Sequence, residues 1–323
     1  MSKSSKKPVD VRWGLVGAGD VCEKKSGPPL YQLPGHRLVA LTRRDAARGK
    51  DFARRHAGEY LPDLPSLLAH PDINAVYVAT PAGAHAEQTI AAAEAGKDVL
   101  VEKPMAMTTK ECRRMVAACQ SNGVLLAVAY YRRGYPSILD AKARLDANEI
   151  GRILEININD QFPPSHRLDL VHYFAGDVDS VRTEKHEKGL ILHAVTRSGA
   201  GLRMNLGWKE VAGAPEQVRI QGEDGEIFIE DLKGGKTSLK SMKGNRELIY
   251  PPLPWTHWGL IENFGFARAG RCPLACDGLE GLKSTAVLDT ISALEPGQPY
   301  QKVDYNNPPE LNRDTAKAHN FLG

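Results

Sequence analysis

Five short apolar runs, separated by helix-compatible segments, dominate the first part of the chain. The runs cover Val11–Val16, 38–41, 75–79, Asp98–Val101 and 124–129. Nearly continuous apolar runs of this length are typical of parallel strands buried on both faces. Helical patterns fill the gaps at 46–56, 65–69, 85–95 and from Thr108 or Thr109 to Ser121. This alternation predicts an α/β fold, a doubly wound parallel Rossmann sheet.

The pattern changes after residue 130. A helix is expected over 137–147, followed by alternating strand-like segments at 152–159, 190–196, 202–208, 217–221 and 226–229. Turn signals separate these segments, which favours a mainly antiparallel open sheet. Two further helices are expected at Trp258–Arg268 and 279–294. We therefore predict a Rossmann domain over 1–130, with 1–9 as a disordered tail, and an α+β domain over 131–323.

Composition narrows the function classes. The chain has 323 residues and a net charge of +3, which is too balanced to argue for nucleic-acid binding. It contains no apolar stretch of the roughly 20 residues needed to span a bilayer. The five cysteines are irregularly spaced, which predicts neither a disulfide framework nor a metal site. We expect a cytoplasmic protein without a membrane or nucleic-acid partner.

A glycine turn follows the first apolar run and is the first candidate for cofactor binding. Gly17 and Gly19 precede a probable helix, in the context of a dinucleotide-binding turn, with Asp20 and Val21 next in the chain. The third small position is Cys22 instead of glycine. The alternative interpretation is an ordinary tight turn between a strand and a helix.

The end of the second run normally selects between NAD and NADP. Here Thr42 is followed by Arg43 and Arg44 before any acidic residue. Guanidinium groups match a 2′-phosphate bidentately, so NADP is favoured over NAD. The alternative is a pair of solvated arginines at a helix start.

Two further strand ends carry candidate site residues. Thr80 and Pro81 end the third run and His85 opens the next helix, where it can touch the cofactor or be solvated. Glu102 and Lys103 end the fourth run. A lysine at this rim can hydrogen-bond a substrate oxygen and move its proton, and burial can lower its pKa. The alternative role for Lys103 is a salt bridge with Glu102.

A histidine in the second half is the other candidate for proton transfer. Apolar residues at 168, 171 and 174 indicate a helix that carries His166 and Asp169 on one face. Pro163 and Pro164 are placed just before its start. A histidine at such a helix start can relay a proton.

Together these motifs resemble the glucose–fructose oxidoreductase / inositol dehydrogenase (Gfo/Idh/MocA) family over nearly the whole chain. The similarity is carried by the segments 11–20, 75–81 with His85, 101–104, 131–133, 257–264 and 277–281. The resemblance implies an NAD(P)-dependent oxidoreductase for a sugar or polyol. It also implies a homo-oligomer, a dimer or tetramer formed through the open sheet. Catalysis is implied for Lys103 and His166, and substrate contacts for Lys103, Tyr131, Arg132, His166 and Asp169.

The chain departs from the family pattern four residues before His166. The family has an aspartate there, whereas this chain has Phe162, and only five residues separate Asp160 from His166. A missing segment would remove a wall of the substrate pocket and an acid/base partner. The alternative function is therefore a catalytically impaired nucleotide-binding sensor or scaffold on the same fold.

Overall fold

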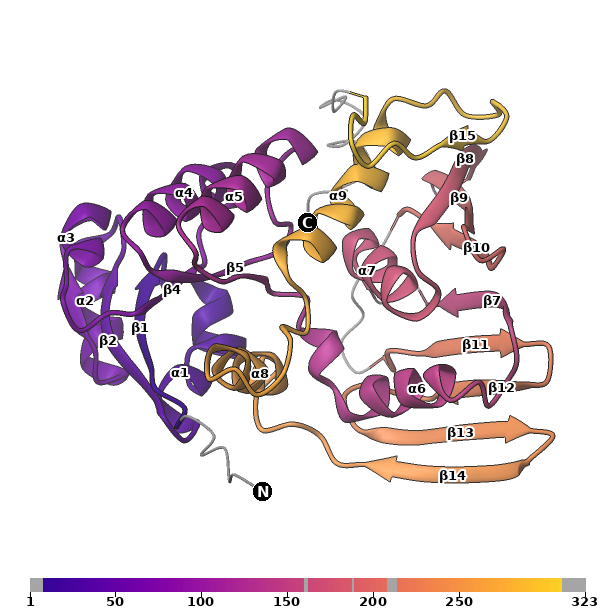
Figure 1. Cartoon of the computed structure of the whole chain (residues 1–323), viewed down its shortest axis with the longest axis horizontal. Coiled ribbons are helices and arrows are strands. Elements are labelled where there is room, and N and C mark those ends of the chain that lie inside the picture. Colours follow the sequence, from indigo (N-terminus) through magenta and orange to yellow (C-terminus); the bar gives the residue numbers. More distant parts are fainter. Residues whose placement is uncertain (1–7, 160–161, 188, 208–213, 310–323) are drawn as a thin grey trace, which may run out of the picture. The chain divides into compact units, whose positions relative to one another are not determined.

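The computed structural model describes residues 8–159, 162–187, 189–207 and 214–309. The chain divides into two compact units (Figure 1). Unit 1 comprises residues 1–134 and 254–281, and unit 2 comprises 135–253 and 282–323. The expected boundary near residue 130 is a single cut, whereas here the segment 254–281 returns to unit 1. Of the expected tail, residues 1–7 lie outside the described part.

Unit 1 is built on a parallel sheet of six strands in the order β3-β2-β1-β4-β5-β6. The strands are β1 (Val11–Val16), β2 (His36–Thr42), β3 (Glu59–Leu61), β4 (Ala75–Val78), β5 (Asp98–Val101) and β6 (Leu126–Val128). Every neighbouring pair is parallel, which confirms the predicted doubly wound sheet. The strand order reverses between β1 and β4, and ligands of such sheets bind beyond the carboxyl ends of the strands at that point.

The helices of unit 1 begin in different ways, three of them at a side-chain cap formed by Asp45, Asp63 or Thr108. They are η1 (Cys22–Ser26), α1 (Pro29–Gln32), α2 (Ala46–Arg55), α3 (Leu64–Leu68), η2 (Ala82–Ala84), α4 (His85–Glu94), α5 (Thr109–Ser121), η3 (Tyr131–Gly134) and α8 (Trp258–Arg268). Thr108 forms a capping box with Glu111 at the start of α5, which settles the choice between Thr108 and Thr109. The helix expected after the glycine turn is an irregular one, because η1 is a π-helical turn instead of a regular α-helix.

Helix α8 packs onto the sheet from a distant part of the sequence. The Trp13 indole donates to Nδ1 of His36 at 3.1 Å, and its ring lies 4.8 Å from that of Phe264 in α8. A Cβ on Gly265 would lie 2.4 Å from Nε2 of His36, so only glycine permits this approach. Since Trp13 belongs to β1 and His36 to β2, α8 completes the core of unit 1.

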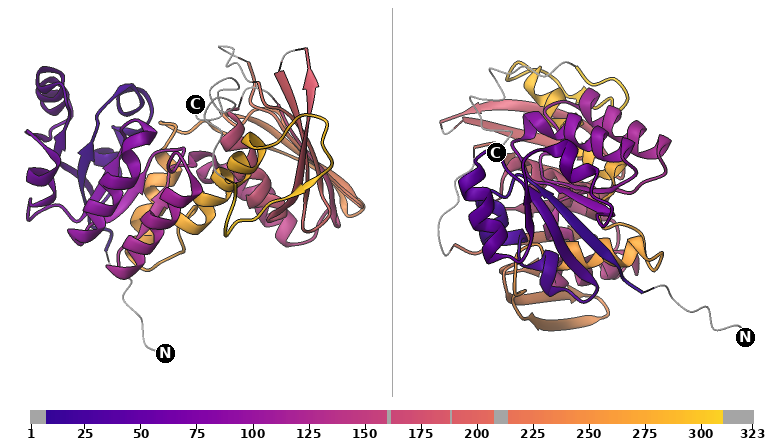
Figure 2. Two further views of the ribbon diagram at one scale, coloured as in Figure 1. Left: turned by 90° about the horizontal axis from the view of Figure 1, so that it is seen from above. Right: turned by 90° about the vertical axis from the view of Figure 1, so that its left-hand side faces the viewer.

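Unit 2 contains a nine-stranded sheet in the order β14-β13-β12-β11-β7-β10-β9-β8-β15. Its elements are α6 (Pro136–Asp146), β7 (Ile153–Ile158), α7 (Pro164–Ala175), β8 (Val178–His186), β9 (Gly189–Thr196), β10 (Gly201–Asn205), β11 (Val218–Gly222), β12 (Gly225–Ile229), β13 (Gly235–Ser241), β14 (Gly244–Tyr250), β15 (Gln301–Lys302) and, mostly, α9 (Gly278–Ser292). All pairs are antiparallel except β7 with β10, which confirms the predicted mainly antiparallel sheet. Helices α6 and α7 lie on one face of this sheet (Figure 2).

Several strands of unit 2 were not predicted from the sequence. β8, β13 and β14 have polar or charged residues at most positions, and β14 is exposed along nearly its whole length. Such strands lack the apolar alternation on which the prediction depends. The strand expected over 202–208 ends at Asn205, and Trp208 lies outside the described residues.

Candidate functional site

The glycine turn after β1 places its two glycines under different constraints. Gly17 has a φ of +117°, and a Cβ at this position would lie 2.3 Å from the carbonyl oxygen of Ala79. Its N–H donates to the carbonyl of Thr42 at 2.9 Å. A Cβ at Gly19 would meet no atom within 4 Å. The fold therefore requires glycine at 17, whereas at 19 the missing side chain leaves open space beside the turn.

The residues after the turn differ in their exposure. Asp20 is exposed and pairs with Lys24 at 3.1 Å, and Val21 is half-buried. Cys22 is buried, which raises the pKa of its thiol to about 12. A small buried side chain at this position gives the close packing that the cofactor fingerprint requires.

A cleft of about 760 Å³ opens beside the glycine turn, within unit 1. It is lined by Val16, Gly17, Gly19, Thr42, Arg43, Arg44, Asp45, Pro62, Asp63, Leu64, Ala79, Thr80, Pro81, Gly83, Ala84 and Gln88. Seven of the predicted cofactor-binding residues are in this set: Gly17, Gly19, Thr42, Arg43, Arg44, Thr80 and Pro81. The predicted residues Asp20, Val21, His85, Glu102 and Lys103 are not. The cleft lies at the ends of β1, β2 and β4, where the strand order reverses.

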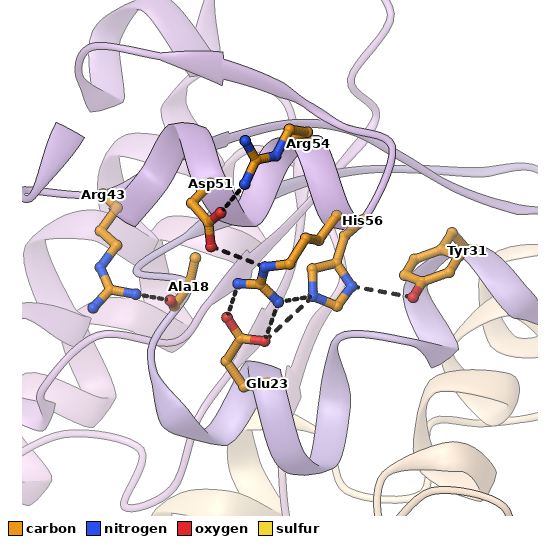
Figure 3. Close-up of polar contacts among 8 residues, drawn as sticks. Ala18, Glu23, Tyr31, Arg43, Asp51, Arg54 and His56 are labelled. Atoms are coloured by element: carbon orange, nitrogen blue, oxygen red, sulfur yellow. Dashed lines mark hydrogen bonds and ion pairs between the residues drawn. The ribbon is translucent and has the colours of Figure 1, made fainter. Parts of the chain in front are cut away.

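The two arginines after β2 have different surroundings. The Arg43 guanidinium donates to the carbonyl oxygen of Ala18 inside the glycine turn (Figure 3). Arg44 is exposed, and no ion pair is found for it among the described residues. Asp45, the first acidic residue, caps α2 by accepting from the N–H of Arg48 at 3.0 Å. Arg44 is therefore the cation that remains available at the cleft.

A charged cluster holds η1 against the end of α2 (Figure 3). Glu23 accepts from Arg55 at 2.8 Å, and Arg55 also donates to Asp51 at 2.9 Å. His56 joins the cluster through its Nε2, 3.3 Å from Glu23, and its Nδ1 lies 3.1 Å from the hydroxyl of Tyr31. The hydrogen bond from Arg55 is the main cause of the lowered pKa of Glu23. The cluster thus fixes the irregular turn that follows the glycines.

His85 connects the ends of β4 and β5. It is the first residue of α4, as predicted, but its ring is buried and not solvated. Nε2 lies 2.7 Å from the carbonyl oxygen of Thr80, and Nδ1 lies 3.0 Å from that of Pro104. Both ring nitrogens therefore face backbone carbonyls, and the ring holds the two strand ends together.

Glu102 is buried at the end of β5, and both oxygens of its carboxylate accept hydrogen bonds. One carboxylate oxygen accepts from the hydroxyl of Tyr77 at 2.6 Å and from Nε2 of His257 at 3.0 Å. The other accepts from the backbone N–H of Lys103 at 3.0 Å. Burial by itself raises the pKa of this carboxyl, but the hydrogen bonds from His257 and Tyr77 and the nearby positive charges outweigh burial and lower it to about 2. Glu102 is thus a buried carboxylate anion.

Lys103 follows directly and is half-buried. Burial lowers the pKa of its amine below the usual range; Glu102 opposes this effect, and Arg132 and Lys25 add to it. No ion pair between Lys103 and Glu102 is found in the part of the chain that the structure describes, because the carboxylate is bound by Tyr77 and His257. The amine is consequently not held in the salt bridge that was the alternative to a catalytic role.

The predicted substrate residues divide between the two units. Tyr131 and Arg132 lie in η3 of unit 1, with the Arg132 guanidinium 4.8 Å from the Tyr131 ring and that ring 4.5 Å from His257. His166 and Asp169 are buried in α7 of unit 2, on the predicted helix. Phe162 is buried just before α7, and Asp160 lies outside the described residues. The structure therefore brings Glu102, Lys103, Tyr131 and Arg132 together in unit 1, and His166 with Asp169 in unit 2.

The residues of this region that the sequence did not predict include three whose side chains hydrogen-bond predicted site residues. They are Tyr77, Gln88 and His257. Gln88 bonds the hydroxyl of Thr80 at 2.6 Å and lines the cleft. Tyr77 interrupts an aliphatic strand, and this is a signal that could have been used. His257 lies 155 positions from its partner Glu102, and no local pattern reveals such a pair.

Two kinds of feature are absent from the part of the chain that the structure describes. No helix there is long and apolar enough to cross a membrane. The same residues contain no group of three or more histidine, cysteine or acidic side chains that could hold a metal ion.

Sequence comparisons link the chain to known oxidoreductases. A family model described as "Oxidoreductase family, NAD-binding Rossmann fold" matches residues 11–130. Oxidoreductase P35 from Formosa agariphila is 38% identical over 253 residues, which cover 67% of this chain and 78% of that protein. Inositol 2-dehydrogenase from Acidothermus cellulolyticus is 30% identical over 251 residues, which cover 68% and 72%.

Solved structures with the same fold cover almost the whole chain. Levoglucosan dehydrogenase in complex with NADH and levoglucosan superposes with a TM-score of 0.76 at 20% identity, covering 91% of this chain and 99% of that one. KijD10, a 3-ketoreductase from Actinomadura kijaniata in complex with TDP-benzene and NADP, gives a TM-score of 0.74 at 22% identity, covering 88% and 97%. At these identities the likeness shows the fold alone.

Proposed function

The chain belongs to the Gfo/Idh/MocA family of oxidoreductases, and on this basis we propose that it transfers hydride between NADP(H) and a hydroxyl/carbonyl pair on a sugar- or polyol-like substrate. The observation that carries the proposal is the half-buried amine of Lys103 at the end of β5, without an acidic partner for its Nζ among the described residues. The substrate class is supported by the similarity to an inositol 2-dehydrogenase.

The cleft fits a dinucleotide. Gly17 keeps the turn tight, and the open space beside Gly19 lets a pyrophosphate approach the backbone. Thr80 and Pro81 line the same cleft at the end of β4. We assign the 2′-phosphate to Arg44 because Arg43 already bonds the carbonyl of Ala18. This assignment favours NADP over NAD.

The chain's own groups supply the proton chemistry. A bound nicotinamide supplies hydride transfer at its C4 carbon. Lys103 polarises the substrate oxygen and exchanges the proton, for which a lowered amine pKa is favourable. His166 is assigned a second proton-transfer role, and Tyr131, Arg132 and Asp169 are assigned substrate contacts.

The decisive test replaces the amine. Lys103→Met should bind NADPH with nearly unchanged affinity in a fluorescence titration. Its turnover, measured with the best substrate from a screen of aldoses, ketoses and polyols, should fall at least about 100-fold because proton transfer is lost. Undiminished turnover would remove Lys103 from the mechanism.

A nucleotide-binding sensor or scaffold is the second candidate function. It is favoured by the buried phenyl ring of Phe162, which stands where the family has an aspartate. Tight NADPH binding without oxidation or reduction of any compound in the screen would support it. Turnover that is lost in His166→Ala would argue against it.

We also propose a cytoplasmic homo-oligomer, a dimer or tetramer. All five cysteines are free thiols, as is usual in a reducing compartment. The face of the unit 2 sheet opposite α6 and α7 is a candidate contact surface (Figure 2). Light scattering of the purified protein tests the oligomeric state, and a monomer at micromolar concentration would contradict it.

A further inference from the structure

A buried carboxylate lies directly behind the candidate catalytic lysine, and the proposed chemistry makes no use of it. Glu102 accepts three hydrogen bonds, from Tyr77, from His257 and from the backbone N–H of Lys103. The last of these is 3.0 Å long and joins the carboxylate to the residue that carries the amine. The position of the lysine backbone thus depends on the position of Glu102.

His257 is the side chain that fixes Glu102 from the most distant part of the chain. Its backbone N–H donates to the carbonyl of Lys25 at 3.3 Å, and its ring packs 4.5 Å from that of Tyr131. It also immediately precedes α8, which is anchored to the sheet by Phe264 and Gly265. The ring therefore has little freedom to leave the carboxylate.

The hydrogen-bond pattern defines the proton on this ring. A carboxylate anion only accepts, so Nε2 of His257 carries the hydrogen and donates it. A buried carboxylate is costly unless it is hydrogen-bonded. Nε2 and the Tyr77 hydroxyl are the two side-chain donors to Glu102 among the described residues.

The charge of Glu102 also balances the surroundings of Lys103. Burial lowers the pKa of the Lys103 amine; of the charged groups that act on it, Glu102 raises the pKa, and Arg132 of η3 and Lys25 of η1 lower it. Glu102 in turn faces the titratable groups of Tyr77, His257, Lys103 and Cys22. If the carboxylate became neutral, the amine would remain partly buried beside two cations.

We propose that His257, assisted by Tyr77, is a positioning residue for Lys103: its Nε2–H holds Glu102 as a buried anion, and Glu102 holds the lysine backbone and balances the charge of the amine. The proposal rests on the proposed role of Lys103 and extends it to a residue of the segment 254–281, which is distant in sequence from Lys103. A purely structural role, in which His257 only docks α8 on the sheet, is the competing explanation.

The test measures the protonation of Lys103 directly and needs no substrate. The full-length protein is labelled competitively with acetic anhydride across a pH series, and acetylation of the Lys103 peptide is quantified by mass spectrometry. His257→Leu removes the donor at similar volume, whereas His257→Gln retains an amide N–H near the position of Nε2. We expect the apparent pKa of Lys103 to fall by about one unit in His257→Leu and to stay near the wild-type value in His257→Gln.

Two further variants establish the route of the effect. Glu102→Gln removes the anion itself and should shift the profile in the same direction as His257→Leu and further, and the double variant should show no shift beyond that of Glu102→Gln, since His257 acts through this carboxylate. Lys25→Met removes a neighbouring cation and should shift the Lys103 profile in the opposite direction. Tyr77→Phe, which keeps the ring, should give a smaller shift in the same direction as His257→Leu and serves if the leucine variant does not fold.

The outcomes separate this proposal from the proposed function. Unchanged labelling profiles in His257→Leu and Tyr77→Phe, or equal shifts in His257→Leu and His257→Gln, would overturn the positioning role. An active Lys103→Met enzyme would overturn the catalytic role of the lysine and leave the labelling result intact. Circular dichroism of each variant tests whether the fold is retained.

Discussion

Two edges of unit 1 carry the candidate chemistry, and they are built in opposite ways. The glycine edge, formed by Gly17, Gly19, Arg43 and Arg44 at the ends of β1 and β2, depends on backbone conformation and on exposed charge. The lysine edge, formed by Glu102, Lys103 and His257, depends on buried hydrogen bonds between residues that are far apart in sequence.

The difference determines how each edge responds to change. At the glycine edge a single Cβ or a single guanidinium decides whether a ligand can approach. At the lysine edge each group is held by several others, so a conservative replacement that keeps a donor should be tolerated. The following predictions test this contrast, in order of the expected effect.

Gly17→Ala should have the largest effect. The added Cβ would lie 2.3 Å from the Ala79 carbonyl oxygen at a φ of +117°, and relief requires movement of the backbone. We expect a loss of about 3 kcal/mol or more in the free energy of unfolding, measured with urea, together with loss of NADPH binding. Gly19→Ala is the matched control: its Cβ meets nothing, so stability should be retained while NADPH affinity falls. Equal destabilisation by both substitutions would contradict the distinction.

Acid should weaken the packing of α8 against His36. Helix α8 is the element that brings His257 to the lysine edge. Burial lowers the pKa of His36 from 6.5 to about 4, so the unfolded chain binds the proton more readily between these two pH values. Stability is therefore complete above pH 6.5 and falls as the pH decreases towards 4. The loss should reach about 3 kcal/mol at most, since one pKa unit corresponds to about 1.4 kcal/mol.

Urea unfolding across this pH range, compared with His36→Gln, measures the contribution of His36. The variant lacks the titrating ring and should show a flatter pH dependence than the wild type. Parallel pH profiles of the two proteins would show that His36 does not titrate in this way.

Arg44→Ser should have the smallest effect and the most specific one. Loss of a charged partner for the 2′-phosphate should weaken NADPH binding about tenfold and leave NADH binding nearly unchanged. Arg43→Ser is the comparison, because it removes the bond to Ala18 and should weaken both cofactors alike. Fluorescence titration with each nucleotide measures the ratio. A loss of NADPH selectivity in Arg43→Ser instead of Arg44→Ser would reverse the assignment.

Local patterns predicted much of unit 1 and less of unit 2. The apolar runs identified five of the six parallel strands, and the glycine turn and Lys103 were placed at strand ends because those positions follow the runs directly. The short strand β3 and the polar strands β8, β13 and β14 were missed, since their stability comes from pairing with neighbours and not from an apolar pattern of their own.

The candidate site was predicted unevenly for the same reason. Gly17, Gly19 and Thr80 could be placed at the cleft because strand ends of a parallel sheet meet at one rim. The different surroundings of Arg43 and Arg44 could not be read from adjacent positions in the chain. His85 was expected as a cofactor contact. Its ring nitrogens instead lie beside the carbonyl oxygens of Thr80 and Pro104, and the sequence does not show that the ends of β4 and β5 meet at this ring.

The amino-acid sequence by itself determined the parallel sheet, the glycine turn and the position of Lys103 at a strand end. Burial and backbone conformation at these places depend on short-range patterns of apolar residues and glycines. Only the tertiary structure decided that α8 belongs to unit 1, that His257 reaches Glu102, and that Arg43, which lines the cleft together with Arg44, bonds the glycine turn. Those facts depend on which surfaces meet after the chain has folded, and no local pattern encodes a partner that lies 155 positions away.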